Sequence, residues 1–329
     1  MRDLFHLISV FLFAPIFFVN SAEAIIVYGQ SNEDSAVKYD SSTTAAEASV
    51  VSINSASAVY LGGGWFITAN HVGITTSMYV TQNGTSAKVS YVDSSLNSNY
   101  GVDLKMFYVS DLSSLEGTLK SVAVSSTVCD SIKGGTFSSR YSPLTGYSLV
   151  YNDGTQVSIV GAGSGRSDSS GLFDSTVESN GVQGTVYSGS GTIYSSTKDA
   201  SGNDIFATMA VTDVGIAQAQ RGDSGSGMFV EYNGQWYLIG VNTNVTQSPD
   251  AANFGDYSYA VLKYGEDGKP SGVDTSAFED FSMTVSQNLS KYADDINLII
   301  ASVPQIPEPR SYAVLISFIS FAFAVWRRR

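Results

Sequence analysis

The sequence predicts an all-β protein, and two observations lead to this prediction. Short runs of β-branched and aromatic residues recur along the chain, and clusters of Gly, Ser, Asn and Asp separate them. Runs at this spacing are typical of an antiparallel sandwich or barrel. The predicted strands cover residues 50–53, 57–61, 65–68, 78–81, 88–92, 106–109, 156–160, 184–187, 228–231, 236–241 and 257–261.

The first 24 residues have the composition of an export signal. Met1 and Arg2 precede an apolar stretch over residues 4–19, and Ala22-Glu23-Ala24 places small residues where a signal peptidase cleaves. The apolar stretch is shorter than the ~20 residues that a membrane span needs, which favours a cleaved signal over a membrane anchor. We therefore expect residues 1–24 to be a signal peptide and signal peptidase to be a partner during export.

One segment near the C-terminus has a helical pattern instead. Apolar residues fall at helical spacing in 288–302, with charged residues on the opposite face. The apolar positions are Leu289, Tyr292, Ile296, Ile299 and Ile300, and the charged positions are Lys291, Asp294 and Asp295. We expect a single amphipathic helix that closes the fold by packing on the β core.

A second apolar segment ends the chain. Pro307-Glu308-Pro309 precedes an apolar stretch over residues 312–326 and the cluster Arg327-Arg328-Arg329. An apolar segment followed by arginines stops transfer and leaves the positive charges in the cytoplasm. This combination resembles the PEP-CTERM sorting tag of Gram-negative bacteria. The resemblance implies that residues 304–329 are a sorting segment with a short transmembrane helix, that an exosortase-type enzyme processes it, and that the protein reaches the cell surface or the medium.

Composition limits the partners. Residues 25–309 contain 12 Lys and Arg, which is 17 less Arg2, Arg310 and the three terminal arginines, against 28 Asp and Glu, so the net charge is about −16. This charge argues against nucleic acid as a partner, because clustered Lys and Arg bind a phosphate backbone. Cys129 is the only cysteine, so no intramolecular disulfide can form.

Two short motifs contain the residues of a nucleophilic enzyme. His71, the one histidine of residues 25–309, follows a Gly-rich strand in Thr68-Ala69-Asn70-His71, and Ser224 lies far downstream in Gly222-Asp223-Ser224-Gly225. A serine hydroxyl attacks a carbonyl only when a base takes its proton and nearby donors stabilise the oxyanion. If Ser224 is such a nucleophile, His71 is its base.

These motifs resemble those of a chymotrypsin-fold (trypsin-like) serine protease of the bacterial secreted type. His71 and Ser224 lie in the family's two motifs, and Asp103, which opens an apolar strand between them, matches its orienting acid. The order His, Asp, Ser is not that of subtilisin or the α/β-hydrolases. The resemblance implies two antiparallel six-stranded β-barrels, at residues 25–140 and 141–303, with a C-terminal helix and the active site in the cleft between the barrels.

The resemblance also implies a role for each residue. Asp103 orients His71, His71 takes the proton of Ser224, and the N–H groups of Gly222 and Ser224 form the oxyanion hole. Asp93 is the alternative acid, but it lies at a strand end before turn residues, where Asp is often only a turn former. We expect no metal and no cofactor, since residues 25–309 contain no Cys/His cluster.

The specificity pocket departs from the familiar enzymes. Counted from Ser224, the pocket floor falls on Gln218 and its wall on Thr243 and Asn244. An Arg or Lys substrate needs a buried carboxylate at the floor, and Gln218 is neutral. We therefore expect a neutral side-chain preference, with Asp213 as the residue that would change this expectation.

Asp223 has two interpretations. In trypsin-like enzymes the residue before the serine pairs with a new apolar N-terminus, and this ion pair orders the pocket. Cleavage after Ala24 creates Ile25 as the N-terminus, so export itself would supply the activating group. Alternatively, residues 25–28 are only an edge strand and backbone donors satisfy Asp223. Both interpretations remain open at this point.

Three functions compete. The leading hypothesis is an exported serine endopeptidase with a protein or peptide substrate. The second is a catalytically inactive protease-like protein that serves in binding or in the matrix at the cell surface. The third is a β-rich adhesin with accidental motifs, which does not explain three matching motifs in the right order.

Overall fold

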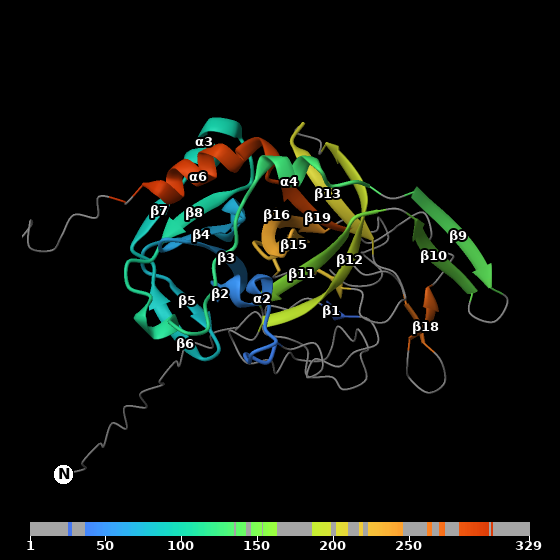
Figure 1. Ribbon diagram of the computed structural model, residues 1–329, viewed down its shortest axis with the longest axis horizontal. Coiled ribbons are helices and arrows are strands. Elements are labelled where there is room, and N and C mark those ends of the chain that lie inside the picture. Colours follow the sequence, from blue (N-terminus) through green and yellow to red (C-terminus); the bar gives the residue numbers. More distant parts are fainter. Residues whose placement is uncertain are drawn as a thin grey trace, which may run out of the picture.

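The computed structural model describes most of the chain between the two terminal segments (Figure 1). Strands dominate the described part and the helices are few and short, so the prediction of a mostly β protein is confirmed. None of the described helices is both long enough and apolar enough to cross a membrane. The predicted signal 1–24, residues 305–329 of the sorting segment and the predicted strand 257–261 lie outside the described residues. The described residues are 26–27, 37–134, 136–142, 146–152, 154–162, 186–198, 202–209, 217–219, 223–245, 262–264, 270–273, 283–302 and 304.

A seven-stranded antiparallel sheet forms the first β unit, in the order β6-β5-β2-β3-β4-β8-β7. Its strands are β2 (Val50–Ile53), β3 (Ala56–Gly62), β4 (Trp65–Thr68), β5 (Tyr79–Gln82), β6 (Thr85–Lys88), β7 (Tyr91–Asp93) and β8 (Lys105–Tyr108). The predicted strands 50–53 and 65–68 have these same bounds, and three others are shifted by about one residue.

This sheet curls so that the end of β6 lies near the start of β7, although the two edge strands do not pair with each other. β6 and β7 lie at opposite edges, yet only Val89 and Ser90 separate them in the chain. The Val89 N–H donates to Met78 O beside β5 (3.0 Å), and the Ser90 N–H donates to Tyr108 O in β8 (2.7 Å). The prediction of one strand over 88–92 is therefore wrong: the alternating pattern continues, but the chain leaves one edge of the sheet and joins the other.

The second β unit is a closed barrel in the order β11-β12-β13-β19-β16-β15. β11 pairs with both β12 and β15, which closes the ring. The strands are β11 (Gln156–Ala162), β12 (Val186–Lys198), β13 (Asp204–Met209), β15 (Gly227–Tyr232), β16 (Gln235–Val245) and β19 (Met283–Asn288). The two β units are thus unequal, because the first has seven strands where six were expected.

Short elements connect and flank the two β units. β1 (Ile26–Val27) pairs with β14 (Ala217–Gln218), and the predicted boundary at 140/141 falls inside β9. Figure 1 shows the β9–β10 hairpin well away from the two β units. The others are α2 (Ala45–Ser49), η1 (Asn70–Val72), α3 (Ser95–Tyr100), η2 (Ser113–Leu115), α4 (Ser126–Asp130), β9 (Thr136–Ser142), β10 (Gly146–Asn152), β17 (Leu262–Tyr264) and β18 (Pro270–Val273).

The predicted closing helix is present but begins later than expected. The strand β19 extends to Asn288, and the turn η4 (Ser290–Tyr292) leads into α6 (Ala293–Ala301). The side chain of Ile296 is buried on the inner face of α6, whereas that of Leu298 is 68% exposed. α6 lies beside α3 over the first sheet (Figure 1), and the indole N–H of Trp65 in β4 donates to Ser302 O at its end (3.1 Å).

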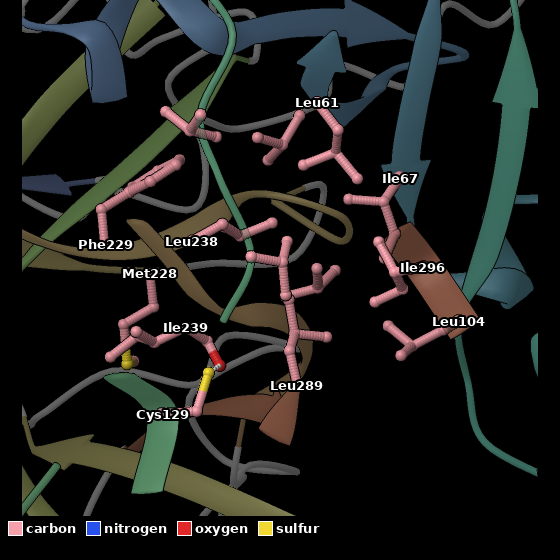
Figure 2. Packing of buried hydrophobic residues seen from close by; sticks show 14 of the residues in the cluster. Leu61, Ile67, Leu104, Cys129, Met228, Phe229, Leu238, Ile239, Leu289 and Ile296 are labelled. Carbon is pink, nitrogen blue, oxygen red and sulfur yellow. Dashed lines mark hydrogen bonds between the residues drawn. The ribbon is translucent and has the colours of Figure 1, made fainter. Parts of the chain in front are cut away.

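One apolar core joins the two units. Figure 2 shows Leu61 and Ile67 of the first sheet in the same cluster as Phe229 and Leu238 of the barrel, with Ile296 of α6 beside them. A second cluster lies within the first sheet alone. Densely packed side chains resist displacement. The shared core therefore fixes the distances between residues of the first sheet and residues of the barrel at the boundary of the two units.

Candidate active site

His71 follows β4, at the boundary of the two β units. β4 ends at Thr68, and the chain turns through η1 with His71 at its centre. The backbone N–H of His71 donates to Asp103 Oδ1 (2.9 Å), and the N–H of Asn70 donates to the main-chain oxygen of Asp103 (3.2 Å). Asp103 therefore fixes the main chain at His71, in addition to its contact with the imidazole ring.

Sheet register explains why His71 and Asp103 meet. β4 and β8 are antiparallel neighbours, and Thr68 pairs with Lys105. The residues just after β4 and just before β8 therefore lie side by side. Asp103 Oδ2 lies 2.6 Å from His71 Nδ1. Because an ionised carboxylate can only accept, Nδ1 carries the proton of the neutral ring.

Asp93, the alternative acid, has a different place. It ends β7, and its Oδ1 accepts from the backbone N–H of Ser95 at 2.8 Å. This is the geometry of a turn-forming aspartate. Of the two candidate acids, the structure places Asp103 against the histidine.

Ser224 reaches the same histidine from the barrel. It lies between β14 and β15, and its Oγ is 2.6 Å from His71 Nε2. With the proton of the neutral imidazole on Nδ1, Nε2 is an acceptor, so the Ser224 hydroxyl donates. A continuous chain of hydrogen bonds thus joins Asp103, His71 and Ser224 across the two β units.

The contacts within this hydrogen-bond chain raise the pKa of His71 and lower the pKa of Asp103. The hydrogen bond to Asp103 raises the pKa of His71, and partial burial opposes this only in part. Burial would raise the pKa of Asp103, but the ring and charge of His71 and the backbone N–H groups of His71 and Asn70 lower it overall. The His71 side chain remains 48% exposed, so a molecule in solution can reach it.

The loop at Ser224 depends on a glycine. Gly225 has φ 84°, and a Cβ built there would lie 2.0 Å from both Ser57 O and Thr68 Oγ1. The Gly225 N–H donates to Asn242 O at 2.8 Å. Two physical reasons therefore favour glycine at position 225: its positive φ, and the lack of room for a Cβ beside Ser57 O and Thr68 Oγ1.

A buried polar network that the sequence analysis missed lies beneath this loop. Asn242 in β16 donates from its side-chain nitrogen to Ser226 Oγ (2.5 Å), and the Ser286 hydroxyl of β19 donates to Asn242 Oδ1. All three side chains are at least 98% buried. Polar side chains inside a barrel need such partners, since an unsatisfied buried group costs about 1–3 kcal/mol. The sequence signal was the polar run Asn242-Thr243-Asn244, which directly follows the predicted strand 236–241.

The predicted pocket residues lie on strands around the loop. Gln218 is in β14, opposite Ile26 of β1, and Asn244 is in β16. Thr243 is half-buried and lies where the register between β16 and β19 shifts, so it is the extra residue of a β-bulge. Bulges re-aim side chains and are common beside functional sites.

The remaining predicted positions have mixed outcomes. Asp223 is 1% exposed and its main-chain oxygen accepts from the N–H of Ser226 (2.9 Å). Gly222 of the predicted oxyanion hole, Ile25 and Asp213 lie outside the described residues. Ser224, which supplies the second predicted oxyanion donor, is described and partly buried.

The parts of the chain that the structure describes contain no group of three or more His, Cys, Asp or Glu side chains able to hold a metal ion. Comparison of the sequence with models of protein families, and with curated proteins, finds no match.

Proposed function

We propose that this protein is a serine hydrolase, and specifically a serine endopeptidase of the trypsin-like family. The observation that carries the proposal is the Asp103–His71–Ser224 hydrogen-bond chain, with 2.6 Å at each side-chain step. A serine with an imidazole acceptor, itself held by a carboxylate, is the arrangement that activates a hydroxyl for attack.

The distribution of these residues over the fold supports the same family. The first β unit supplies His71 and Asp103, and the barrel supplies Ser224, as in two-barrel proteases with the site between the barrels. The chain order His, Asp, Ser also fits. We propose that the curled seven-stranded sheet is the counterpart of the first barrel.

The proposed reaction is acyl transfer followed by hydrolysis. His71 Nε2 takes the Ser224 proton as Oγ attacks the peptide carbonyl carbon, and Asp103 stabilises the imidazolium that forms. The N–H groups of Ser224 and Gly222 would bind the oxyanion. The imidazolium then gives its proton to the leaving amine, the C–N bond breaks, and water, activated by the same His71, releases the acid.

Substrate preference is proposed from the pocket positions. Gln218, Thr243 and Asn244 are neutral, and a pocket without a carboxylate does not favour Arg or Lys. We propose cleavage after neutral residues. A peptide library scored by mass spectrometry tests this, and dominant cleavage after Arg or Lys would contradict it and implicate Asp213.

Activation by a new N-terminus remains one of two alternatives. Ile26 and Val27 pair with β14 in the full chain, which favours the edge-strand interpretation. The burial of Asp223 favours the ion-pair interpretation. Ile25→Gly separates them: unchanged activity in the exported protein supports an edge strand, and lost activity supports pairing of the Ile25 amine with Asp223.

Labelling with a serine-reactive fluorophosphonate tests the central proposal. The protein is produced with its own signal, its N-terminus is determined, and the wild type is compared with Ser224→Ala and His71→Ala. Labelling that disappears in both variants supports the proposal. A folded wild type that starts at Ile25 and does not label would instead support an inactive protease-like binding protein. Cell fractionation in the same experiment tests the proposed export and surface location.

A further inference from the structure

Ser57 joins the first sheet to the loop of the nucleophile. It lies in β3 and is fully buried. Its N–H donates to the main-chain oxygen of Ser224 (2.9 Å). Its hydroxyl donates to Ala162 O (3.2 Å) and accepts from Ala162 N–H (2.9 Å), at the end of β11 in the barrel. Three hydrogen bonds of one residue therefore cross from the first sheet to the second β unit.

Thr68 binds the main-chain carbonyl of Ser57. Its Oγ1 donates to Ser57 O at 2.6 Å, and its side chain is fully buried. Thr68 is the last residue of β4, and the turn that contains His71 follows directly. The Thr68 hydroxyl thus links the strand that positions the base to the residue that binds the carbonyl of the nucleophile.

Gly225 shows how closely the loop rests on this pair. A Cβ at Gly225 would approach Ser57 O and Thr68 Oγ1 to 2.0 Å, far inside van der Waals contact. The backbone after Ser224 therefore cannot move toward the first sheet without a clash. The N–H of Ser57 bonded to Ser224 O limits movement away from it.

We infer that Thr68 and Ser57 are positioning residues that set the separation between Ser224 Oγ and His71 Nε2 across the two β units. This inference rests on the proposed function. Neither side chain touches the reacting atoms, so their effect is on geometry alone. A displacement of about 1 Å at a reacting centre can cost about a hundredfold in rate, so a fixed joint at this boundary has a catalytic consequence.

Two substitutions at Thr68 separate the effect of its hydroxyl from the effect of its side-chain shape. Thr68→Val keeps the shape and removes the donor, and Thr68→Ser keeps the donor and removes a methyl group. Ser49→Ala is the matched control, because Ser49 is also fully buried and its hydroxyl bonds within α2 to Ala46 O (2.7 Å), away from the loop. The full chain is used, with His6→Gln so that His71 is the only imidazole.

The first measurement is the limiting rate of fluorophosphonate labelling. We expect Thr68→Val to lower it by about tenfold to a hundredfold, with Thr68→Ser and Ser49→Ala near the wild type. The second is the ¹⁵N signal of His71 Nε2, which reports the hydrogen bond from Ser224 without any reaction. We expect Thr68→Val to move this signal toward its position in Ser224→Ala, and Thr68→Ser to restore it.

The outcomes distinguish this inference from the proposed function. Wild-type values of both readouts in Thr68→Val would overturn the inference, as would a loss in Thr68→Ser that exceeds the loss in Thr68→Val. If the wild type with Ile25 as its N-terminus does not label, the proposed function fails, and the Nε2 signal still decides whether Thr68 positions Ser224. Circular dichroism checks folding, and if Thr68→Val does not fold, the same two readouts on Ser57→Ala decide.

Discussion

Asp103 holds His71 through both its backbone and its ring, which determines the pH range in which His71 is neutral. The hydrogen bond to Asp103 raises the pKa of His71 above its ordinary value of 6.5. Since the raised pKa belongs to the folded state, protonation of His71 contributes stability below pH 6.5, and this contribution is lost as the pH rises through the folded value. A general base must be neutral, so activity should rise over the same interval in which this stability is lost.

Replacement of Asp103 tests this linkage. Asp103→Asn removes the carboxylate and presents an amide that favours the wrong tautomer, so we expect the labelling rate to fall by roughly 10⁴-fold. The acidic limb of the residual pH profile should move to lower pH, because the group that raises the His71 pKa is gone. A pH series of labelling rates measures both effects. An unmoved limb would show that Asp103 does not control the His71 pKa.

Gly225 provides a steric test at the same scale. Gly225→Ala combines a positive φ with a clash, whereas Gly84→Ala has φ 75° and no atom within 4 Å of the new Cβ. A left-handed conformation alone costs about 1–2 kcal/mol, so we expect that loss for Gly84→Ala and a larger one for Gly225→Ala. Urea unfolding gives the two values. Equal losses would show that the loop shifts freely away from Ser57 and Thr68.

At the residue scale, the sequence predicts the contact residues of the site but not their supports. His71, Asp103 and Ser224 lie in short motifs whose order is informative, and the structure brings the three together. Ser57 and Asn242 lie in no motif. Their importance depends on strand register and on a boundary between two β units, which residue types alone do not reveal.

At the element scale, strands were easiest to predict where apolar residues mark them. β2 and β4 are continuous buried runs, and their predicted bounds match the structure. β19 was missed because Thr284, Ser286 and Gln287 are polar, although all three are buried in the barrel. Partners from neighbouring strands, such as Asn242 for Ser286, make that burial possible, and no local pattern encodes such a partner.

The two faces of α6 give an element-scale prediction. Ile296 is fully buried in the core shared by both units, so Ile296→Ala should cost about 2–5 kcal/mol of unfolding free energy. Leu298→Ala removes a side chain that is 68% exposed and should change stability by less than about 0.5 kcal/mol. Urea denaturation of both variants compares the faces. Similar losses would mean that α6 is not docked as described.

Cys129 in α4 provides a probe of local opening. Its thiol is buried, and burial raises its pKa to about 12. Because the thiolate is the reactive form, we expect no reaction with a thiol reagent in the native protein and one thiol per chain after unfolding. Absorbance after addition of an aromatic disulfide measures this. Rapid reaction of the native protein would indicate that α4 opens independently of the barrel.

At the scale of the whole molecule, the shared core predicts cooperative unfolding. Trp65 belongs to the first sheet and Trp236 to the barrel, and both contact the cluster that joins the units. In two variants that each keep one of these tryptophans, with the others changed to Phe, we expect the fluorescence midpoint in urea to coincide with the circular-dichroism midpoint of the same variant. Two separate midpoints would contradict a single shared core.

The global architecture was predictable only in part. A mostly β chain with a closing helix followed from residue patterns, and both features are present. The form of the sheets was not predictable in detail: the first unit has seven strands and is not a closed barrel, and Val89 and Ser90 connect its two edge strands. Pairing between the first and last strands of a unit is a long-range event, whereas the patterns used here are local.

The short edge strands β6 and β7 have a consequence for association between molecules. An exposed strand edge is a template on which other chains assemble into aggregates. Val89 and Ser90 direct their N–H groups to opposite ends of the first sheet, and the barrel is closed on itself. Among the described residues, the free edges of the first sheet are the short strands β6 and β7, of four and three residues. These short edges leave little backbone for a second copy of the chain to pair with.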